Sequence, residues 1–227
     1  MLVCFAVVLR RLPSFIVFTA VLMTIESETR QRCQNCTRPL THCLCSLIPS
    51  LPSRTRVLIL QHPDEAKHAL NTARLAALGL QNAQMLIGET FNDLQSYIQQ
   101  PGYRACVLFP GEEAQMLSAY QDDQQPLLLV VPDGTWRKAR KILHCNPLLA
   151  TLPRVTLAPG LSSRYRLRKA PDENALATVE AVTHALNMLE PNADFSPLLR
   201  PFDALIEGQI QAMGAEVYQR NHVDSSR

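Results

Sequence analysis

The sequence contains little glycine, few aromatic residues and almost no net charge. Glycine accounts for 8 of the 227 residues, tryptophan for 1, and aromatic side chains for 6%. No Gly-x-Gly-x-x-Gly follows the first expected strand and no Walker-type loop is present, which argues against a Rossmann dinucleotide site and a P-loop site. Lys and Arg total 22 against 20 Asp and Glu. A net charge of +2 neither demands nor excludes a nucleic-acid partner.

The first 23 residues contain no apolar run long enough to cross a bilayer. Leu2–Leu9 and Leu12–Met23 are separated by Arg10 and Arg11, and each run is shorter than the roughly 18–20 residues that a spanning helix needs. The segment fits an over-extended start whose true first residue is Met23, a membrane-associating tail, or a cleaved signal, although no small-x-small cleavage site follows. We favour the start at Met23, which predicts a cytoplasmic protein without membrane contact.

Apolar runs alternate with helix-like segments along the remaining chain. The expected strands are 56–60, 83–87, 106–109, 127–131 and 154–157, and the expected helices are 64–78, 92–99, 112–120, 136–143, 174–189 and 202–218. This alternation predicts an α/β fold with a mostly parallel sheet and helices on both faces. The expected divisions are an apolar extension (1–23), a Cys-rich segment (24–52), the α/β domain (53–219) and a tail (220–227).

Four of the seven cysteines lie within 13 positions. They form Cys33-x-x-Cys36 and, after six intervening residues, Cys43-x-Cys45. Four thiolates at short spacing are the ligand set of a closed, tetrahedral structural zinc site. An iron–sulfur cluster and unliganded thiols are the alternatives. The thiolates also indicate a reducing compartment rather than export.

The tetrapeptide Asp133-Gly134-Thr135-Trp136 stands between an apolar run and a basic segment. A strand that ends in these residues and turns into a helix places polar groups at the carboxyl edge of a sheet, where open α/β sheets bind ligands. The alternative is an ordinary turn, with Asp133 or Thr135 as the helix cap and Trp136 in the core.

Cations gather in two blocks, one after Trp136 and one near residue 166. The first contains Arg137, Lys138, Arg140 and Lys141, and the second Arg164, Arg166, Arg168 and Lys169. Such blocks are typical of phosphate-binding patches, and equally of solvated helix faces.

Taken together, these motifs resemble the DTW-domain family over residues 33 to 189. The resemblance rests on the four cysteines, Gln61-His62-Pro63-x-Glu65-x-x-His68-x-x-Asn71-Thr72, Phe109-Pro110-Gly111, Asp133-Gly134-Thr135-Trp136-x-x-Ala139 and Ser163-Arg164-Tyr165-x-Leu167-Arg168. It implies a tRNA-uridine aminocarboxypropyltransferase that moves the 3-amino-3-carboxypropyl group of S-adenosylmethionine to N3 of a uridine and releases 5′-methylthioadenosine. It also implies a similarity to SPOUT methyltransferases, with a C-terminal trefoil knot, which is a rare topology.

The resemblance and the strand-end position together suggest roles for individual residues. The catalytic candidates are Asp133, Thr135 and Trp136. The candidates for binding the donor are His62, Asn71, Thr72, Pro110, Gly111, Asp133, Gly134, Arg164 and Arg168. The candidates for binding RNA are Lys138, Arg140, Lys141, Arg166 and Lys169. Cys33, Cys36, Cys43 and Cys45 are the candidate zinc ligands.

Several of these roles have alternatives. Asp133 would accept the proton from N3 of the target uridine, or hold the turn by bonding to amides of the following helix. Trp136 would stack on adenine, stack on the target base, or pack in the core. His62 would contact a ligand or backbone. Thr178 and Glu180 are interpreted as residues that pack a late helix.

Two other functions fit the same sequence. One is an S-adenosylmethionine-dependent RNA methyltransferase of the same fold, and the other is a zinc-knuckle RNA-binding protein without catalysis. In every case RNA is the expected partner, no protein partner is implied, and a monomer is expected.

Overall fold

A parallel sheet of six strands forms the centre of the part of the chain that the computed structural model describes, residues 31–167 and 175–223. The strands are β1 (Arg56–Gln61), β2 (Ala83–Ile87), β3 (Arg104–Leu108), β4 (Gln115–Met116), β5 (Leu127–Asp133) and β6 (Arg154–Thr156). Their order across the sheet is β2-β1-β5-β3-β6-β4, and every pair of neighbours is parallel. All six carboxyl ends therefore meet at one edge.

Seven α-helices connect or follow these strands within the described residues. They are α1 (Pro63–Ala66), α2 (Ala73–Gly79), α3 (Leu94–Ile98), α4 (Trp136–Cys145), α5 (Thr178–Leu189), α6 (Arg200–Met213) and α7 (Ala215–Tyr218). Short 3₁₀ helices occur at Leu40–His42, Cys45–Leu47, Leu117–Tyr120, Pro147–Thr151 and Ser196–Leu199, and a π-helical turn at Gln219–Val223.

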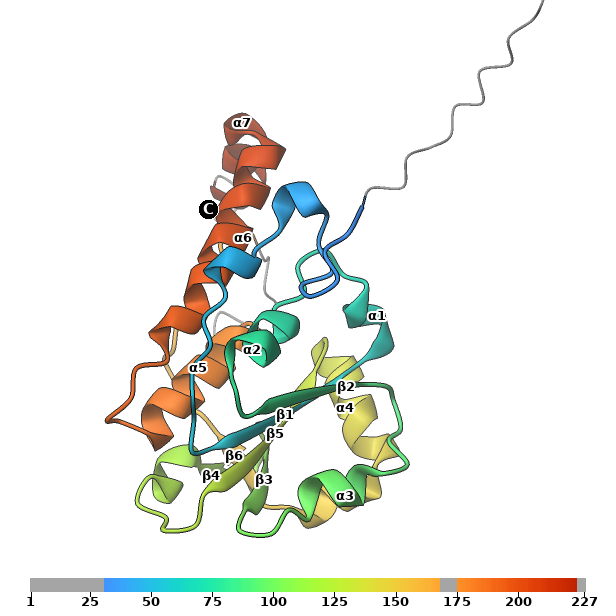
Figure 1. Ribbon diagram of the computed structural model, residues 1–227, viewed down its shortest axis with the longest axis vertical. Coiled ribbons are helices and arrows are strands. Elements are labelled where there is room, and N and C mark those ends of the chain that lie inside the picture. The colour runs from blue at the N-terminus through green and yellow to red at the C-terminus, as the bar shows by residue number, and fades with distance from the viewer. Residues whose placement is uncertain (1–30, 168–174, 224–227) are drawn as a thin grey trace, which may run out of the picture. The chain divides into compact units, whose positions relative to one another are not determined.

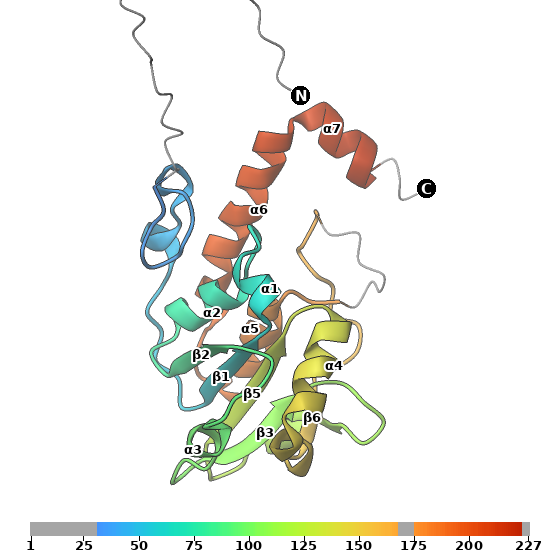
Figure 2. The ribbon, with the colours of Figure 1, turned by 90° about the vertical axis from the view of Figure 1, so that its right-hand side faces the viewer.

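Both faces of the sheet are covered, as the sequence pattern predicts. Helices α2, α5 and α6 pack on one face against side chains such as Val57, Ile59 and Leu129. Helices α3 and α4 pack on the other face against Leu58 and Val130 (Figures 1 and 2). Because β1 and β5 are buried on both sides, they form continuous apolar runs rather than alternating ones.

Two predicted helices are wrong, each for a local reason. The helix expected over 64–78 is divided into α1 and α2, because the Asn71 side chain accepts the Arg74 N–H at 3.2 Å and begins a new helix there. The helix expected over 112–120 is instead edge strand β4 and a 3₁₀ turn, with Met116 paired to Thr156 of β6.

The two late helices are shorter than expected. The helix expected over 174–189 begins at Thr178, after a stretch of which residues 175–177 are described and non-helical. The helix expected over 202–218 is interrupted at Gly214, whose φ of +86° suits glycine and separates α6 from α7.

The Cys-rich segment from residue 31 onward belongs to the same compact unit as the sheet. The divisions at residues 23, 52 and 219 stay predictions, and the proposed start at Met23 lies outside the described residues. None of the helices in the described ranges has the length and apolar content needed to cross a membrane.

Candidate functional site

A cavity of about 930 Å³ opens at the carboxyl edge of the sheet. Its walls come from the ends of β3, β5 and β6, the loop between α1 and α2, the segment 157–167 and the first turns of α4 and α5. The polar side chains that line it include Glu65, His68, Asn71, Thr72, Asp133, Thr135, Lys138, Thr156 and Thr178. The apolar lining includes Leu108, Phe109, Met116, Val131, Trp136, Leu157, Leu161, Tyr165 and Leu176. This edge is where the sequence predicts a ligand site.

The turn from β5 to α4 shapes one wall of the cavity. Gly134 has φ +152°, and a Cβ there would lie 2.9 Å from the Cβ of Lys138, so a side chain would be both strained and too close. Thr135 caps α4, with its hydroxyl accepting the Lys138 N–H at 3.4 Å. The cap that the ordinary-turn alternative assigned to Asp133 or Thr135 is therefore made by Thr135.

Asp133 is buried, and its carboxylate accepts hydrogen bonds from two other elements. The Gln61 amide of β1 donates to Oδ2 at 2.8 Å, and the Thr178 hydroxyl of α5 donates to Oδ1. Gln61 is in turn fixed by Asn71, because the two amide groups exchange hydrogen bonds of 3.1 Å in both directions. The strand end, the α1–α2 loop and α5 thus hold the carboxylate in one orientation at the cavity wall.

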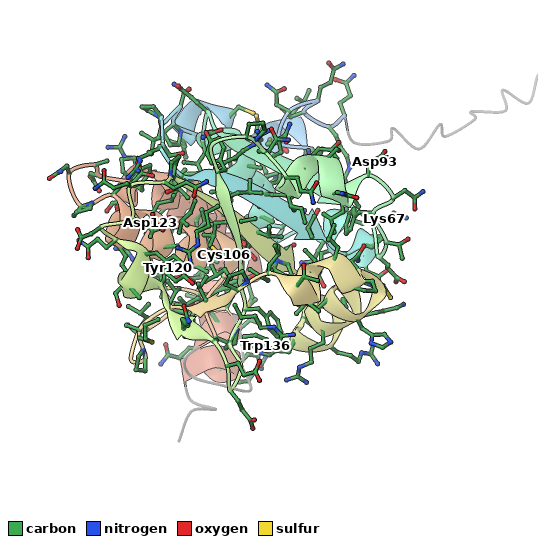
Figure 3. The ribbon with its side chains drawn as sticks, turned by 90° about the horizontal axis from the view of Figure 1, so that it is seen from below. Lys67, Asp93, Cys106, Tyr120, Asp123 and Trp136 are labelled. Carbon is green, nitrogen blue, oxygen red and sulfur yellow. The ribbon has the colours of Figure 1, made fainter. Side chains whose placement is uncertain are left out.

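Trp136 lies at the start of α4 with 37% of its surface exposed (Figure 3). Its ring meets the Phe109 ring edge to face, with a centroid distance of 5.6 Å and an interplanar angle of 74°. Both rings line the cavity. The alternative that places Trp136 in the core is therefore wrong.

The lysines of α4 are paired with acidic side chains. Lys138 Nζ lies 2.9 Å from Glu65 Oε1 and 3.4 Å from Asp64 Oδ2, and hydrogen bonding to Glu65 raises the pKa of Lys138. Lys141 Nζ lies 2.7 Å from Glu89 Oε2, a contact that raises the pKa of Lys141. Both lysines stay protonated, but the neighbouring carboxylates offset their positive charge, so they attract a phosphate less than unpaired lysines would.

His62 is buried behind this edge and is not among the residues that line the cavity. Its Nδ1 accepts the Asp64 N–H at 3.3 Å, which caps α1, and its Nε2 lies 2.9 Å from Glu89 Oε1. Both ring nitrogens are thus engaged with protein, which favours the backbone alternative over the ligand alternative for this residue.

The four cysteines of the Cys-rich segment converge. Their Sγ atoms all lie within 4.8 Å of one another, with Cys33 and Cys45 3.5 Å apart and Cys36 and Cys43 3.8 Å apart. Tetrahedral zinc with Zn–S bonds of about 2.3 Å separates its sulfurs by about 3.8 Å, so the cluster fits that geometry.

The local backbone prepares part of this cluster for a cation. The N–H groups of Cys36 and Asn35 lower the pKa of the Cys33 thiol to about 6, while burial raises the pKa of Cys45 to about 12. Metal binding requires thiolates, so a bound cation would also deprotonate the Cys45 thiol.

The family model of the DTW domain matches residues 30–210. The chain belongs to the DTW-domain family. It is 33% identical over 203 residues to tRNA-uridine aminocarboxypropyltransferase 2 of Macaca fascicularis, covering 84% of this chain and 67% of that protein. It is 32% identical over 192 residues to the protein of the same name of Drosophila melanogaster (80% and 76%), and 29% identical over 212 residues to tRNA-uridine aminocarboxypropyltransferase A of Arabidopsis thaliana (77% and 80%). No solved structure matches the chain significantly.

In this DTW protein the predicted site residues separate into two groups. The cavity brings together Asn71, Thr72, Pro110, Asp133, Gly134, Thr135, Trp136 and Lys138. Arg164 and Arg166 are exposed and pair with Asp203 at 3.2 Å and Glu207 at 2.9 Å on α6, and Gly111 is not among the lining residues. Arg168 and Lys169 lie outside the described residues.

Sequence reasoning missed the residues that hold the DTW motif in place. Gln61 and Thr178 bond to Asp133, and Glu180 is 1% exposed and accepts three hydrogen bonds. These come from the Ser163 hydroxyl at 2.6 Å, the Arg164 N–H at 2.6 Å and the Ala177 N–H at 2.8 Å. The packing interpretation of Thr178 and Glu180 was therefore incomplete. Because Ala177 rather than Ser or Thr precedes the helix, the sequence lacks the capping box that would have pointed to Glu180.

We expect Glu180→Ala to lower the free energy of unfolding by about 2–5 kcal/mol, because it leaves one buried N–H group, one partly buried N–H group and a hydroxyl without their acceptor. Glu180 ties the segment that carries Leu161 and Tyr165 to α5, so binding in the cavity should also weaken. Urea unfolding measures the first effect. Glu180→Gln keeps one acceptor oxygen and should lose less. A Glu180→Ala protein as stable as the wild type would contradict the role assigned to this carboxylate.

Proposed function

We propose that this chain transfers the 3-amino-3-carboxypropyl group of S-adenosylmethionine to N3 of a uridine in tRNA, as a tRNA-uridine aminocarboxypropyltransferase. One observation carries the proposal: the cavity at the carboxyl edge of the sheet is built from the DTW motif, with its buried carboxylate fixed by two other elements. The relatives that cover most of this chain bear the name of this activity.

The size and the lining of the cavity support this proposal. Its volume of about 930 Å³ lies within the range of about 300–1,000 Å³ that is usual for small-molecule sites. Apolar walls such as Leu157 and Leu176 suit the adenine, and the buried Asp133 carboxylate suits the positively charged sulfonium group. When bound, the donor supplies an electrophilic carbon next to its sulfonium.

The side chains of the cavity would then position two reactants and move one proton. The bond between uridine N3 and the γ-carbon forms as the carbon–sulfur bond breaks, and the sulfur leaves with both electrons as neutral 5′-methylthioadenosine. Uridine N3 must lose its proton, and the Asp133 carboxylate would accept it. Gln61 and Thr178 would hold that carboxylate in a fixed orientation, so both its orientation and its basicity would contribute to the rate of proton transfer.

Four further parts of the proposal rest on the resemblance or on the site chemistry. The four cysteines would hold a structural zinc ion, since an iron–sulfur cluster spreads its thiolates further apart than this arrangement does. The SPOUT relationship and its trefoil knot, the monomeric state and the cytoplasmic location stay predictions.

Incubating the full chain with S-adenosylmethionine and unmodified tRNA tests the proposal. We expect mass spectrometry to detect 3-(3-amino-3-carboxypropyl)uridine among the nucleosides and 5′-methylthioadenosine among the small molecules. S-adenosylhomocysteine with a methylated base would instead identify a methyltransferase. Bound tRNA without either product would identify a non-catalytic RNA-binding protein.

A further inference from the structure

Helix α4 carries its cations on two faces that differ in charge balance. Lys138 and Lys141, three residues apart, share one face and pair with Glu65 and Glu89. Their positive charge is largely neutralised by protein. This face therefore offers little to a polyanion, although both lysines belong to the basic block that the sequence analysis selected.

The neighbouring face of α4 carries Trp136, Arg137 and Arg140. Arg140 lies four residues after Trp136 and three after Arg137, so its side chain neighbours both of them on the helix. All three are exposed, and within residues 31–167 and 175–223 neither arginine is placed in an ion pair or hydrogen bond. An exposed aromatic ring beside two unneutralised guanidinium groups is the pattern that single-stranded nucleic acid recognises, with bases on the ring and phosphates on the cations.

The Trp136 ring lies at the mouth of the cavity rather than in its depth. Trp136 is 37% exposed and Met116, which also lines the cavity, is 40% exposed, whereas Asp133 is 8% exposed and its partner Gln61 is fully buried. Contact with the Phe109 ring holds the indole at a fixed angle. A small ligand is usually buried over about 70–90% of its surface, which favours the deeper walls for adenine and leaves the mouth for a base that enters from outside.

We propose that the target uridine stacks on Trp136 while the flanking tRNA phosphates bind Arg137 and Arg140. This inference rests on the proposed function, because it assigns the RNA side of the same site. A uridine taken out of its stack would present its N3 edge towards the interior, where the Asp133 carboxylate lies. The paired lysines Lys138 and Lys141 then have a different task, which is to fix α4 against α1 and the loop after β2.

Trp136 is the sole tryptophan, so its fluorescence reports on this one position. We would titrate the full chain with S-adenosylmethionine alone, with a tRNA transcript that becomes modified, and with one that does not. Stacking predicts that the modified tRNA quenches the emission far more than the other two additions. Full quenching by S-adenosylmethionine alone would place Trp136 against adenine. Equal quenching by both transcripts, or none by either, would also overturn the proposal.

Substitutions at the ring separate stacking from packing. Trp136→Leu should weaken binding of the modified tRNA about 5- to 150-fold, the effect of losing one base–aromatic stack, and Trp136→Phe should recover most of it. Binding of S-adenosylmethionine should change little in either variant. If these substitutions weakened the binding of S-adenosylmethionine and not that of tRNA, the assignment of Trp136 to the target base would be overturned.

The arginines have a matched control on the other side of the sheet. Arg137→Gln and Arg140→Gln should each lower by about 1 the slope of log affinity for tRNA against log salt concentration. Arg200→Gln, on α6, should leave the slope unchanged. Unchanged slopes in both α4 variants would rule out the proposed contacts between these arginines and tRNA phosphates. Nucleoside analysis of the same mixtures reads transfer separately: transfer without the stacking signal overturns this inference alone, and no transfer to any tRNA overturns the proposed function.

Discussion

Asp133→Asn should lower the turnover number for aminocarboxypropyl transfer by about 10²- to 10⁴-fold, the usual contribution of a general base. The substitution keeps the size of the side chain. The amide oxygen of the new residue would still accept from Gln61, and its NH₂ group would donate to Thr178, whose hydroxyl rotates to accept. The fold is therefore preserved and the proton acceptor is lost. Turnover is measured as 5′-methylthioadenosine released per enzyme at saturating tRNA.

Thr178→Val serves as the matched control for this result. It removes one hydrogen bond to the Asp133 carboxylate but leaves the carboxylate itself, so we expect a smaller loss than in Asp133→Asn. Wild-type turnover in Asp133→Asn would rule out the general-base role. An equal loss in both variants would indicate that orientation of the carboxylate, rather than its basicity, dominates.

Cys36→Ser should abolish stoichiometric zinc binding and lower Tm by about 8–16 °C. Cys36 is 3% exposed, so a water molecule could not take the place of its sulfur as a metal ligand without disturbing the surrounding segment. Loss of a structural metal is among the changes that cost more than about 4 kcal/mol, and each kcal/mol shifts Tm by about 2–4 °C in a chain of this size. Elemental analysis measures the metal and calorimetry measures Tm.

Cys145→Ser is the control for the loss of a thiol alone. Cys145 is half-buried at the end of α4, outside the cluster of four sulfurs, so metal content and Tm should both stay at the wild-type values. Full metal content and unchanged melting in Cys36→Ser would refute the assignment of Cys36 as a ligand of a structural metal. If the purified protein contained iron and absorbed visible light, the metal site would instead be identified as an iron–sulfur cluster.

The sequence predicts the sheet better than the helices, for a physical reason. Buried strands such as β1 and β5 need apolar residues at every position, so their pattern is visible in a short window. The break between α1 and α2 depends on the Asn71 side chain, which bonds to Gln61 across the edge of the sheet as well as to Arg74. A contact of this kind depends on the fold and leaves no periodic signal.

The site shows the same division. The DTW motif and the cysteine spacing are local in sequence, and both could be selected from it. Gln61 and Thr178, which bond to Asp133, are 72 and 45 residues away, on β1 and α5, and no local sequence pattern points to them. The choice among cations also required the structure, because the neutralisation of Lys138 and Lys141 depends on acidic residues from other elements.

The Cys-rich segment is fastened to the loop between α1 and α2. The Arg38 guanidinium donates to the Ala69 carbonyl at 2.7 Å, and Arg74 donates back to the Asn35 carbonyl at 3.5 Å. That loop carries Asn71, which lines the cavity and orients Gln61. These two hydrogen bonds link the cluster of four sulfurs to a wall of the cavity some thirty residues further along the chain, so a change in the cluster is expected to alter binding in the cavity.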